Sequence, residues 1–155
     1  MKTLILGLGN TIRADDGVGI HIANKLKDLH PELDVIEASA AGFRIIDEII
    51  GYDKLILIDS IQTGQKPVGS YYIFGMDEFQ KTMHHTSPHD MSMFEAFEMM
   101  KEHDADLPGE VVIYAIEVKD TLTFSEECTP EVTVAIPKIA DIIFRREFPP
   151  RQNLT

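Results

Sequence analysis

Short apolar runs alternate along the chain with stretches of helical spacing. Apolar runs that end at a glycine or a carboxylate, such as residues 4–7 and 55–58, are typical of buried strands. Apolar residues spaced three or four apart predict amphipathic helices between such runs. We expect five strands, at residues 4–7, 35–36, 55–58, 70–74 and 111–118. We expect four helices, at residues 16–29, 43–50, 87–101 and 129–146.

The order of these elements predicts an α/β layered fold with a mostly parallel sheet. Strands that alternate with helices favour parallel pairing, whereas an α+β domain would keep strands and helices in separate blocks. Residues 55–58 are apolar on both faces, as expected for a central strand covered on both sides. The 155 residues suffice for a single domain, which we place at residues 1–148. We expect residues 149–155 to form a frayed tail.

Composition and charge disfavour several classes of partner. Hydrophobic residues make up 44% of the chain, which argues against disorder. The net charge of −12 repels nucleic-acid phosphates and anionic lipid, so we expect neither a nucleic acid nor a membrane as partner. No apolar stretch approaches the roughly 18 residues of a membrane span, and the first apolar run is too short for a signal peptide. Cys128 is the single cysteine, which favours a reducing compartment, and we expect a cytoplasmic protein.

Carboxylates gather where the predicted strands end. Ligands of open α/β sheets bind at the carboxyl ends of the strands, and Asp59 directly follows the apolar run 55–58. The same position also suits a helix N-cap or a loop ion pair. Asp15 and Asp16 open the first predicted helix, where acidic residues satisfy free amides and the helix dipole. Two adjacent carboxylates cannot both cap one helix, so one of them is available for another role.

A histidine adds a nitrogen ligand to the same edge. A serine–proline pair begins a predicted helix at residue 87, and His89 lies in its first turn. The helix dipole there favours the neutral imidazole that a metal needs. The two preceding histidines are expected in a solvated loop. Asp16, Asp59 and His89 together would form an oxygen and nitrogen metal site.

Other catalytic patterns are absent from the sequence. Without a CxxC or HExxH motif, neither a closed zinc finger nor a zincin is expected. Without a G-x-S-x-G motif, Ser/His/Asp catalysis is disfavoured. Cys128 precedes a predicted helix start, and we expect it to be a packed small residue rather than a nucleophile.

A glycine turn after the first strand favours, as an alternative, a small nucleotide-binding module. Gly7 and Gly9 follow that strand and Glu37 follows the next one, as in dinucleotide-binding folds. However, Ile12 stands where the third glycine of G-x-G-x-x-G would be. The glycines then serve a tight turn that brings Asn10 to the edge of the sheet.

The opening segment resembles the signature of the hydrogenase maturation proteases. It reads Gly-Leu-Gly-Asn at residues 7–10 and Asp-Asp-Gly-Val-Gly at residues 15–19, and the two motifs are specific in combination. The same family is matched, in order, by Gly42, residues 57–59, the segment around His89 and residues 129–132. The resemblance covers nearly the whole chain and implies a three-layer α/β/α sandwich with a twisted five-stranded sheet.

The resemblance implies a cytoplasmic endopeptidase that removes a short C-terminal extension from the precursor of a nickel–iron hydrogenase large subunit. Cleavage would follow nickel insertion, with the nickel presented by the precursor and no nucleotide involved. The family's metal-binding and catalytic positions carry over to Asp16, Asp59 and His89, with His84 as the alternative histidine. Many relatives have Glu at the position of Asp16, and residues 38–41 are less glycine-rich than in relatives. A nickel-delivery protein without peptidase activity is a further alternative.

Overall fold

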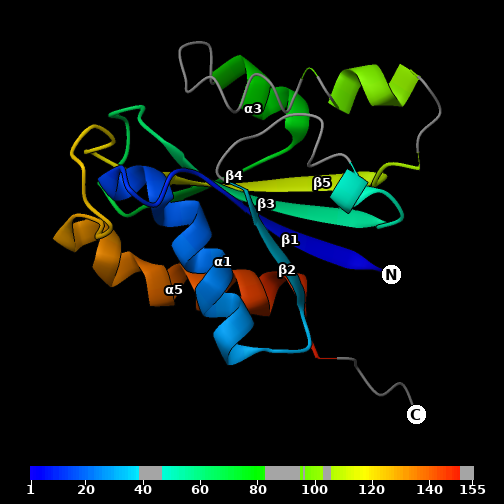
Figure 1. The fold of residues 1–155 in the computed structure, drawn as a ribbon, viewed down its shortest axis with the longest axis horizontal. Helices are drawn as coiled ribbons and strands as arrows, with labels where there is room; N and C mark the ends of the chain where they lie inside the picture. Colours follow the sequence, from blue (N-terminus) through cyan, green and yellow to red (C-terminus); the bar gives the residue numbers. More distant parts are fainter. Residues whose placement is uncertain (39–46, 83–94, 96, 103–105, 151–155) are drawn as a thin grey trace.

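The computed structural model describes residues 1–38, 47–82, 95, 97–102 and 106–150. The centre of the fold is a five-stranded sheet with the strand order β2-β1-β3-β5-β4 (Figure 1). The strands are β1 (Thr3–Leu8), β2 (Asp34–Ala38), β3 (Lys54–Ile61), β4 (Tyr71–Phe74) and β5 (Glu110–Glu117). β4 pairs antiparallel to β5, and the other neighbours are parallel. The mostly parallel five-stranded sheet predicted from the sequence is therefore confirmed.

Helices cover both faces of this sheet and complete a three-layer α/β/α sandwich (Figure 1). α1 (Val18–Leu29) and α5 (Pro130–Glu147) pack on one face and contact each other. α3 (Met76–Thr82) covers the opposite face together with the helical residues 97–102. A short 3₁₀ turn, η1 (Ala14–Gly17), precedes α1. None of the helices in the described parts of the chain is long and apolar enough to cross a lipid bilayer.

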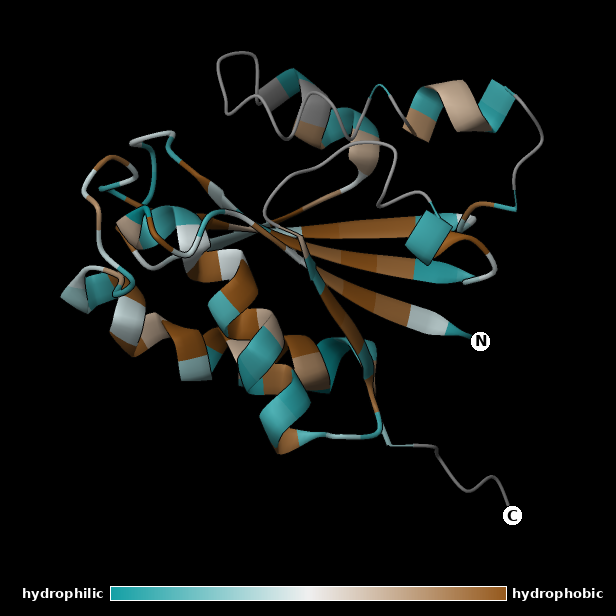
Figure 2. Cartoon of the chain, viewed as in Figure 1, coloured by the Kyte–Doolittle hydropathy of each residue, from teal (hydrophilic) through white to brown (hydrophobic). Residues whose placement is uncertain are grey.

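Alternate residues of the strands point into two separate cores, one under each helical layer. Ile5 of β1 and Ile56 of β3 pack beneath α1 and α5. Leu6 and Leu57, one residue further along each strand, pack toward α3. Because both faces are covered, the strands are apolar along most of their length, as the brown strands of Figure 2 show.

The first helix begins later than the sequence predicted. We expected it to start at Asp16, but that residue belongs to η1, and α1 begins at Val18. The physical reason is that neither Asp15 nor Asp16 caps α1. Gly17 occupies the N-cap position and makes no side-chain hydrogen bond. The two carboxylates are therefore used elsewhere.

α3 is an element that the sequence pattern did not predict. It has only seven residues, and among those whose side chains are described Phe79 alone is fully buried, which is too little to give a visible periodicity. The described parts of the two other predicted helices contain the helical residues 47–49, 95 and 97–102. The domain end at residue 148 and the frayed tail after it stay predictions, and residues 151–155 lie outside the described part of the chain.

Two glycines let α1 lie directly on the carboxyl ends of β1 and β3. A Cβ atom on Gly19 would lie 2.2 Å from the carbonyl oxygen of Ile58 and 2.6 Å from that of Leu8. A Cβ atom on Gly7 would lie 2.7 Å from the carbonyl oxygen of Gly19. No side chain tolerates such contacts, so a larger residue would push the helix away from the sheet. This close packing holds η1, and with it Asp16, at the edge of the sheet.

Candidate active site

Two buried carboxylates, Asp16 and Asp59, lie at the carboxyl edge of the sheet. Asp59 is part of β3, and Asp16 belongs to the η1 turn that follows β1. The exposed fraction is 4% for Asp16 and 0% for Asp59. Burial of a carboxylate is costly unless hydrogen bonds or a cation stabilise it. The partners of these two groups therefore decide what they can do.

Ser60 follows Asp59 in β3 and forms a hydrogen bond with Asp16. Its hydroxyl donates to Oδ1 of Asp16 at 3.4 Å, and its backbone N–H donates to Oδ1 of Asp59 at 2.8 Å. β1 and β3 are parallel neighbours, so the segments that leave their carboxyl ends meet at this point. Asp16 thus contacts the residue that follows Asp59, although Asp16 and Asp59 are 43 residues apart in the sequence.

The turn after β1 holds the other oxygen of Asp16. The backbone N–H of Asn10 donates to Oδ2 of Asp16 at 2.9 Å, and Oδ1 of Asn10 accepts the N–H of Ile12 at 3.1 Å. Gly9 makes this turn possible, because its φ is +145° and a Cβ atom there would lie 2.0 Å from the carbonyl oxygen of Asp16. The turn is therefore shaped around Asp16.

The same packing argues against the nucleotide-binding alternative. The space beside Gly9 is filled by the backbone of Asp16, whereas dinucleotide-binding folds leave it to the pyrophosphate. Glu37, the acidic residue on which that alternative rests, accepts a hydrogen bond from Nδ2 of Asn24 at 3.2 Å. The glycine turn thus serves the packing of the chain itself.

Asp16 keeps unused capacity to bind a cation or a proton. Within the described residues it accepts two hydrogen bonds and forms no ion pair with a basic side chain. Carboxylate oxygens suit divalent metals, and a carboxylate can also act as a general base. In that same part of the chain, no three His, Cys, Asp or Glu side chains are grouped so that they could hold a metal ion.

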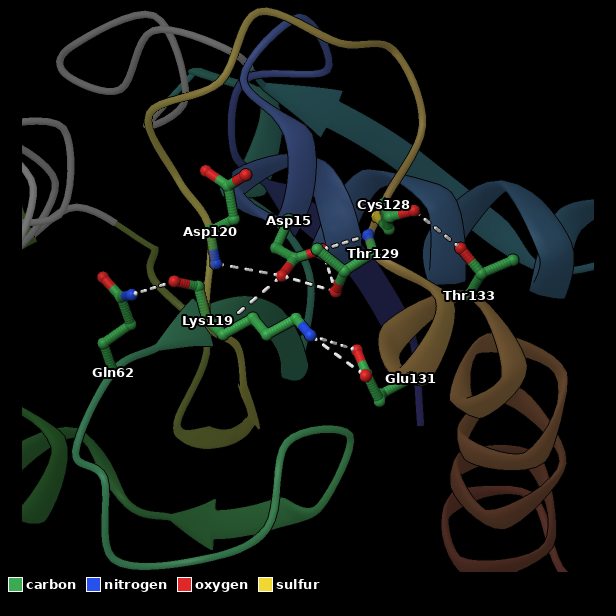
Figure 3. Close-up of polar contacts among 8 residues, drawn as sticks. All are labelled: Asp15, Gln62, Lys119, Asp120, Cys128, Thr129, Glu131 and Thr133. Carbon is green, nitrogen blue, oxygen red and sulfur yellow. Dashed lines mark hydrogen bonds and ion pairs between the residues drawn. The ribbon is translucent and has the colours of Figure 1, made fainter.

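Asp15, the neighbour of Asp16, is bound by the segment between β5 and α5 (Figure 3). Its Oδ1 accepts the N–H of Thr129 at 2.7 Å, and the hydroxyl of Thr129 lies within 3.0 Å of both oxygens. Its Oδ2 accepts the N–H groups of Lys119 and Asp120 at 3.2 and 3.1 Å. Asp15 is fully buried. It is therefore a structural residue, which fastens η1 to the start of α5.

Two side chains near Asp15 have shifted pKa values. The ammonium of Lys119, 2.8 Å from Glu131, holds the pKa of that carboxyl below its ordinary value. Burial, together with the charge of Asp15, raises the pKa of the Cys128 thiol to about 12. The thiol is thus protonated, and it donates to the carbonyl oxygen of Ala14 at 3.7 Å. This agrees with the expectation of a packed cysteine rather than a nucleophile.

Glu117 is another buried carboxylate at this edge, and the sequence analysis did not single it out. It ends β5, and its exposed fraction is 1%. It accepts the N–H of Thr63 at 2.9 Å and the hydroxyl of Tyr72 at 3.3 Å, and the Thr63 hydroxyl also donates to it. These bonds hold the loop that follows β3. The signal that could have found Glu117 is the one that singled out Asp59, a carboxylate at the end of an apolar run.

Comparison with known proteins decides the family. A family model described as HycI, hydrogenase maturation protease, matches residues 20–146, which is well over half of the chain. The chain belongs to the hydrogenase maturation protease family. The hydrogenase 2 maturation protease of Escherichia coli is 21% identical over 140 residues, which cover 88% of this chain and 84% of the relative. A putative hydrogenase maturation protease of Methanocaldococcus jannaschii is 34% identical over 68 residues, 41% of this chain and 44% of the relative.

Solved structures of maturation proteases have the same fold. The hydrogenase maturating endopeptidase HybD from Escherichia coli superposes with a TM-score of 0.82 at 21% identity, over 95% of this chain and 93% of HybD. HybD from Thermococcus kodakarensis superposes with a TM-score of 0.78 at 23% identity, over 94% of this chain and 99% of that protein. At these identities the likeness establishes the fold, and it confirms the predicted α/β/α architecture.

The site residues expected in this maturation protease fall into two groups. Asp16 and Asp59 lie in the described part of the chain, both buried at the carboxyl edge of the sheet. His89 and the alternative His84 lie outside the described residues, as does Gly42. The structure therefore describes two of the three expected site residues, Asp16 and Asp59.

Proposed function

We propose that this maturation protease removes the C-terminal extension of a nickel–iron hydrogenase large-subunit precursor after nickel insertion. The family match and the names of the relatives, which are proteases or endopeptidases of hydrogenase maturation, support the reaction class. The proposal places the reaction in the cytoplasm, in keeping with the free, half-buried thiol of Cys128.

The observation that carries the proposal is the burial of two carboxylates, Asp16 and Asp59, at the carboxyl edge of the sheet. Nickel accepts carboxylate oxygen and imidazole nitrogen as ligands. In this proposal, Asp16, Asp59 and His89 add ligands to a nickel ion that the cysteines of the precursor already hold. The nickel is thus part of the substrate, and only a loaded precursor completes the site.

Asp16 also suits the role of a general base. Within the described residues its carboxylate accepts hydrogen bonds from two donors, one of them at 3.4 Å, so a further acceptor position is available. In the proposed hydrolysis, the carboxylate takes a proton from water while the water oxygen bonds to the scissile carbonyl carbon. The bond from that carbon to the amide nitrogen then breaks, and the proton passes to the leaving amine.

Intact-mass spectrometry of the cognate precursor, incubated with this protein before and after nickel loading, tests the proposal. We expect the loaded precursor alone to lose a C-terminal peptide. Alanine at Asp16, Asp59 or His89 should leave a folded protein that does not process the precursor. Asp77→Ala is the matched control, because it removes an exposed carboxylate at the start of α3 and should process normally.

Each other outcome contradicts a defined part of the proposal. Cleavage of both precursor forms would overturn nickel recognition. Cleavage of neither form, with nickel transfer to the precursor, would replace the peptidase with a nickel-delivery protein. Normal processing by all three alanine variants would overturn the assigned site.

A further inference from the structure

Three exposed apolar side chains lie on two neighbouring segments beside the candidate active site. Leu122 and Phe124, in the loop between β5 and α5, are 78% and 84% exposed, and Ile12, in the turn after β1, is 50% exposed. Figure 2 shows brown stretches in the loops to the left of the sheet. Single exposed apolar side chains are ordinary, whereas a group of them marks an interaction surface. We call Ile12, Leu122 and Phe124 the apolar rim.

Backbone hydrogen bonds join the two segments of the apolar rim. The N–H of Ser125 donates to the carbonyl oxygen of Ile12 at 3.0 Å, and the N–H of Ala14 donates to the carbonyl oxygen of Ser125 at 2.9 Å. These bonds pair Arg13 with Ser125 in a parallel bridge. Ile12 and Phe124 each precede a bridged residue, so they occupy equivalent positions on the two segments.

The loop that carries Leu122 and Phe124 is held in shape by the protein itself. Oδ1 of Asp120 accepts the N–H groups of Leu122 and Thr123 at 3.1 and 3.0 Å. Hydrogen bonds from Thr123 and Leu122 hold the pKa of Asp120 below its ordinary value. The N–H of Asp120 donates to the buried Asp15. A surface that is already ordered loses less conformational entropy when a partner binds.

The apolar rim is continuous with the candidate active site. The N–H of Ile12 donates to the side chain of Asn10, and the N–H of Asn10 donates to the carboxylate of Asp16. Two hydrogen bonds therefore separate a rim residue from a proposed catalytic carboxylate. When the scissile segment of a substrate protein lies at Asp16, neighbouring parts of that substrate lie next to the apolar rim.

Charges in the same loop restrict the chemistry of the partner. Glu126 and Glu127 are exposed, and Asp120 lies in the preceding turn. The ammonium of Lys119 is paired with Glu131, so it does not neutralise these carboxylates. Arg13, on the other segment, offsets one of these three carboxylates, so the surface stays net acidic and fits a partner segment that combines apolar and basic side chains.

We propose that the apolar rim is a docking surface for the precursor protein and binds an apolar segment with basic neighbours. The proposal rests on the proposed function, because the partner is the protein that the active site cleaves. The rim contributes to binding and takes no part in the chemical step.

A double variant, Leu122→Ser with Phe124→Ser, tests the docking surface. Both side chains are exposed, so the variant should fold like the parent protein. With nickel-loaded precursor as substrate, we expect KM to rise about tenfold or more while kcat stays unchanged. The Kd for the same precursor, measured by surface plasmon resonance with parent and double variant both in an Asp16→Ala background that slows turnover, should rise by a similar factor. Leu29→Ser is the matched control: it changes a side chain that is 52% exposed at the carboxyl end of α1, and both constants should stay unchanged.

The outcomes separate this inference from the proposed function. If the double variant keeps the KM and Kd of the parent, the docking surface is overturned, and cleavage by the parent still supports the proposed function. If the parent binds the precursor through the rim but does not cleave it, docking stands and the proposed function fails. If sedimentation velocity finds a dimeric parent and a monomeric double variant, the rim binds a second copy of this chain and the proposal is overturned.

Discussion

Asp15 and Asp16 are consecutive residues of η1, and both are buried, but their surroundings differ. Asp15 accepts hydrogen bonds from the N–H groups of Lys119, Asp120 and Thr129, and from the Thr129 hydroxyl. Asp16 accepts one backbone N–H at 2.9 Å and one hydroxyl at 3.4 Å. Asp15 thus joins two distant parts of the backbone, while Asp16 keeps acceptor capacity at the edge of the sheet.

This difference teaches that burial alone does not identify a catalytic carboxylate. A buried carboxylate whose oxygens accept many hydrogen bonds stabilises the fold. One that is buried with few donors is held there at a cost in stability, which is typical of a functional group. By this criterion Glu117, with the N–H groups of Thr63 and Gly64 and two hydroxyls as donors, resembles Asp15.

The largest effect is expected for processing by Asp16 variants. Asp16→Ala should slow precursor cleavage by about 100-fold or more, because it removes the proposed nickel ligand or general base. Asp16→Glu keeps the charge and should retain cleavage within about tenfold of the parent rate. Intact-mass spectrometry of the loaded precursor gives the rates, and circular dichroism confirms folding. Equal rates for Asp16→Ala and the parent would remove Asp16 from the site.

Asp15→Ala should reduce stability rather than chemistry. It leaves three partly buried N–H groups and the Thr129 hydroxyl without their acceptor, so we expect a loss of about 2–4 kcal/mol in the free energy of unfolding. Urea denaturation measures this loss. Asp141→Ala is the control, since Asp141 pairs with Arg145 on the exposed surface of α5 and its loss should cost less than about 1 kcal/mol. Equal stability of the two variants would contradict a structural role for Asp15.

Thr129→Val makes a finer change to the same network. Valine keeps the shape of the side chain and the N–H bond to Asp15 but removes the hydroxyl, so we expect a loss of about 1 kcal/mol. Thr133→Val, in the same helix, removes an exposed hydroxyl that donates to the carbonyl oxygen of Cys128, and should cost less than about 0.5 kcal/mol. Thermal unfolding measures the loss of stability in both variants. A larger loss for Thr133→Val than for Thr129→Val would contradict the role of the Thr129 hydroxyl in this network.

The smallest effect on precursor processing is expected for thiol reagents that modify Cys128. With its pKa at about 12 instead of 9.0, the Cys128 thiol is ionised in about one molecule in 10⁴ at pH 8, against about one in ten for an ordinary thiol. Iodoacetamide should therefore modify the native protein roughly 10³-fold more slowly than the urea-unfolded protein and leave processing unchanged. Peptide mass spectrometry follows the modification. Rapid modification with loss of processing would make Cys128 a functional residue.

The sheet could be predicted from the sequence because its central strands are covered on both faces. β3 and β5 therefore appear as apolar runs that no surface helix would contain. α3 could not be predicted, since Phe79 and the partly buried Met76 are too few apolar contacts to give its seven residues a periodic pattern. The start of α1 was placed two residues early, because the acidic pair looked like a helix cap and instead bonds outside the helix.

The candidate site was predictable only in part. Asp59 is visible from its place after an apolar run, and Glu117 shows the same signal. The division between Asp15 and Asp16 could not be predicted, because the donors to Asp15 lie 104 to 114 residues further along the chain. Hydrogen bonds between such distant residues leave no local pattern in a sequence.

The division of roles between these two residues is tested most directly by comparing Asp15→Asn with Asp16→Asn in one experiment. Both substitutions remove one negative charge and keep the side-chain shape. We predict that Asp15→Asn melts roughly 5–10 °C below the parent and processes loaded precursor at the parent rate well below its melting temperature. We predict that Asp16→Asn melts within about 2 °C of the parent and processes about 100-fold more slowly. The account would be contradicted by an Asp15→Asn protein that is stable but inactive, or by an Asp16→Asn protein that is active but unstable.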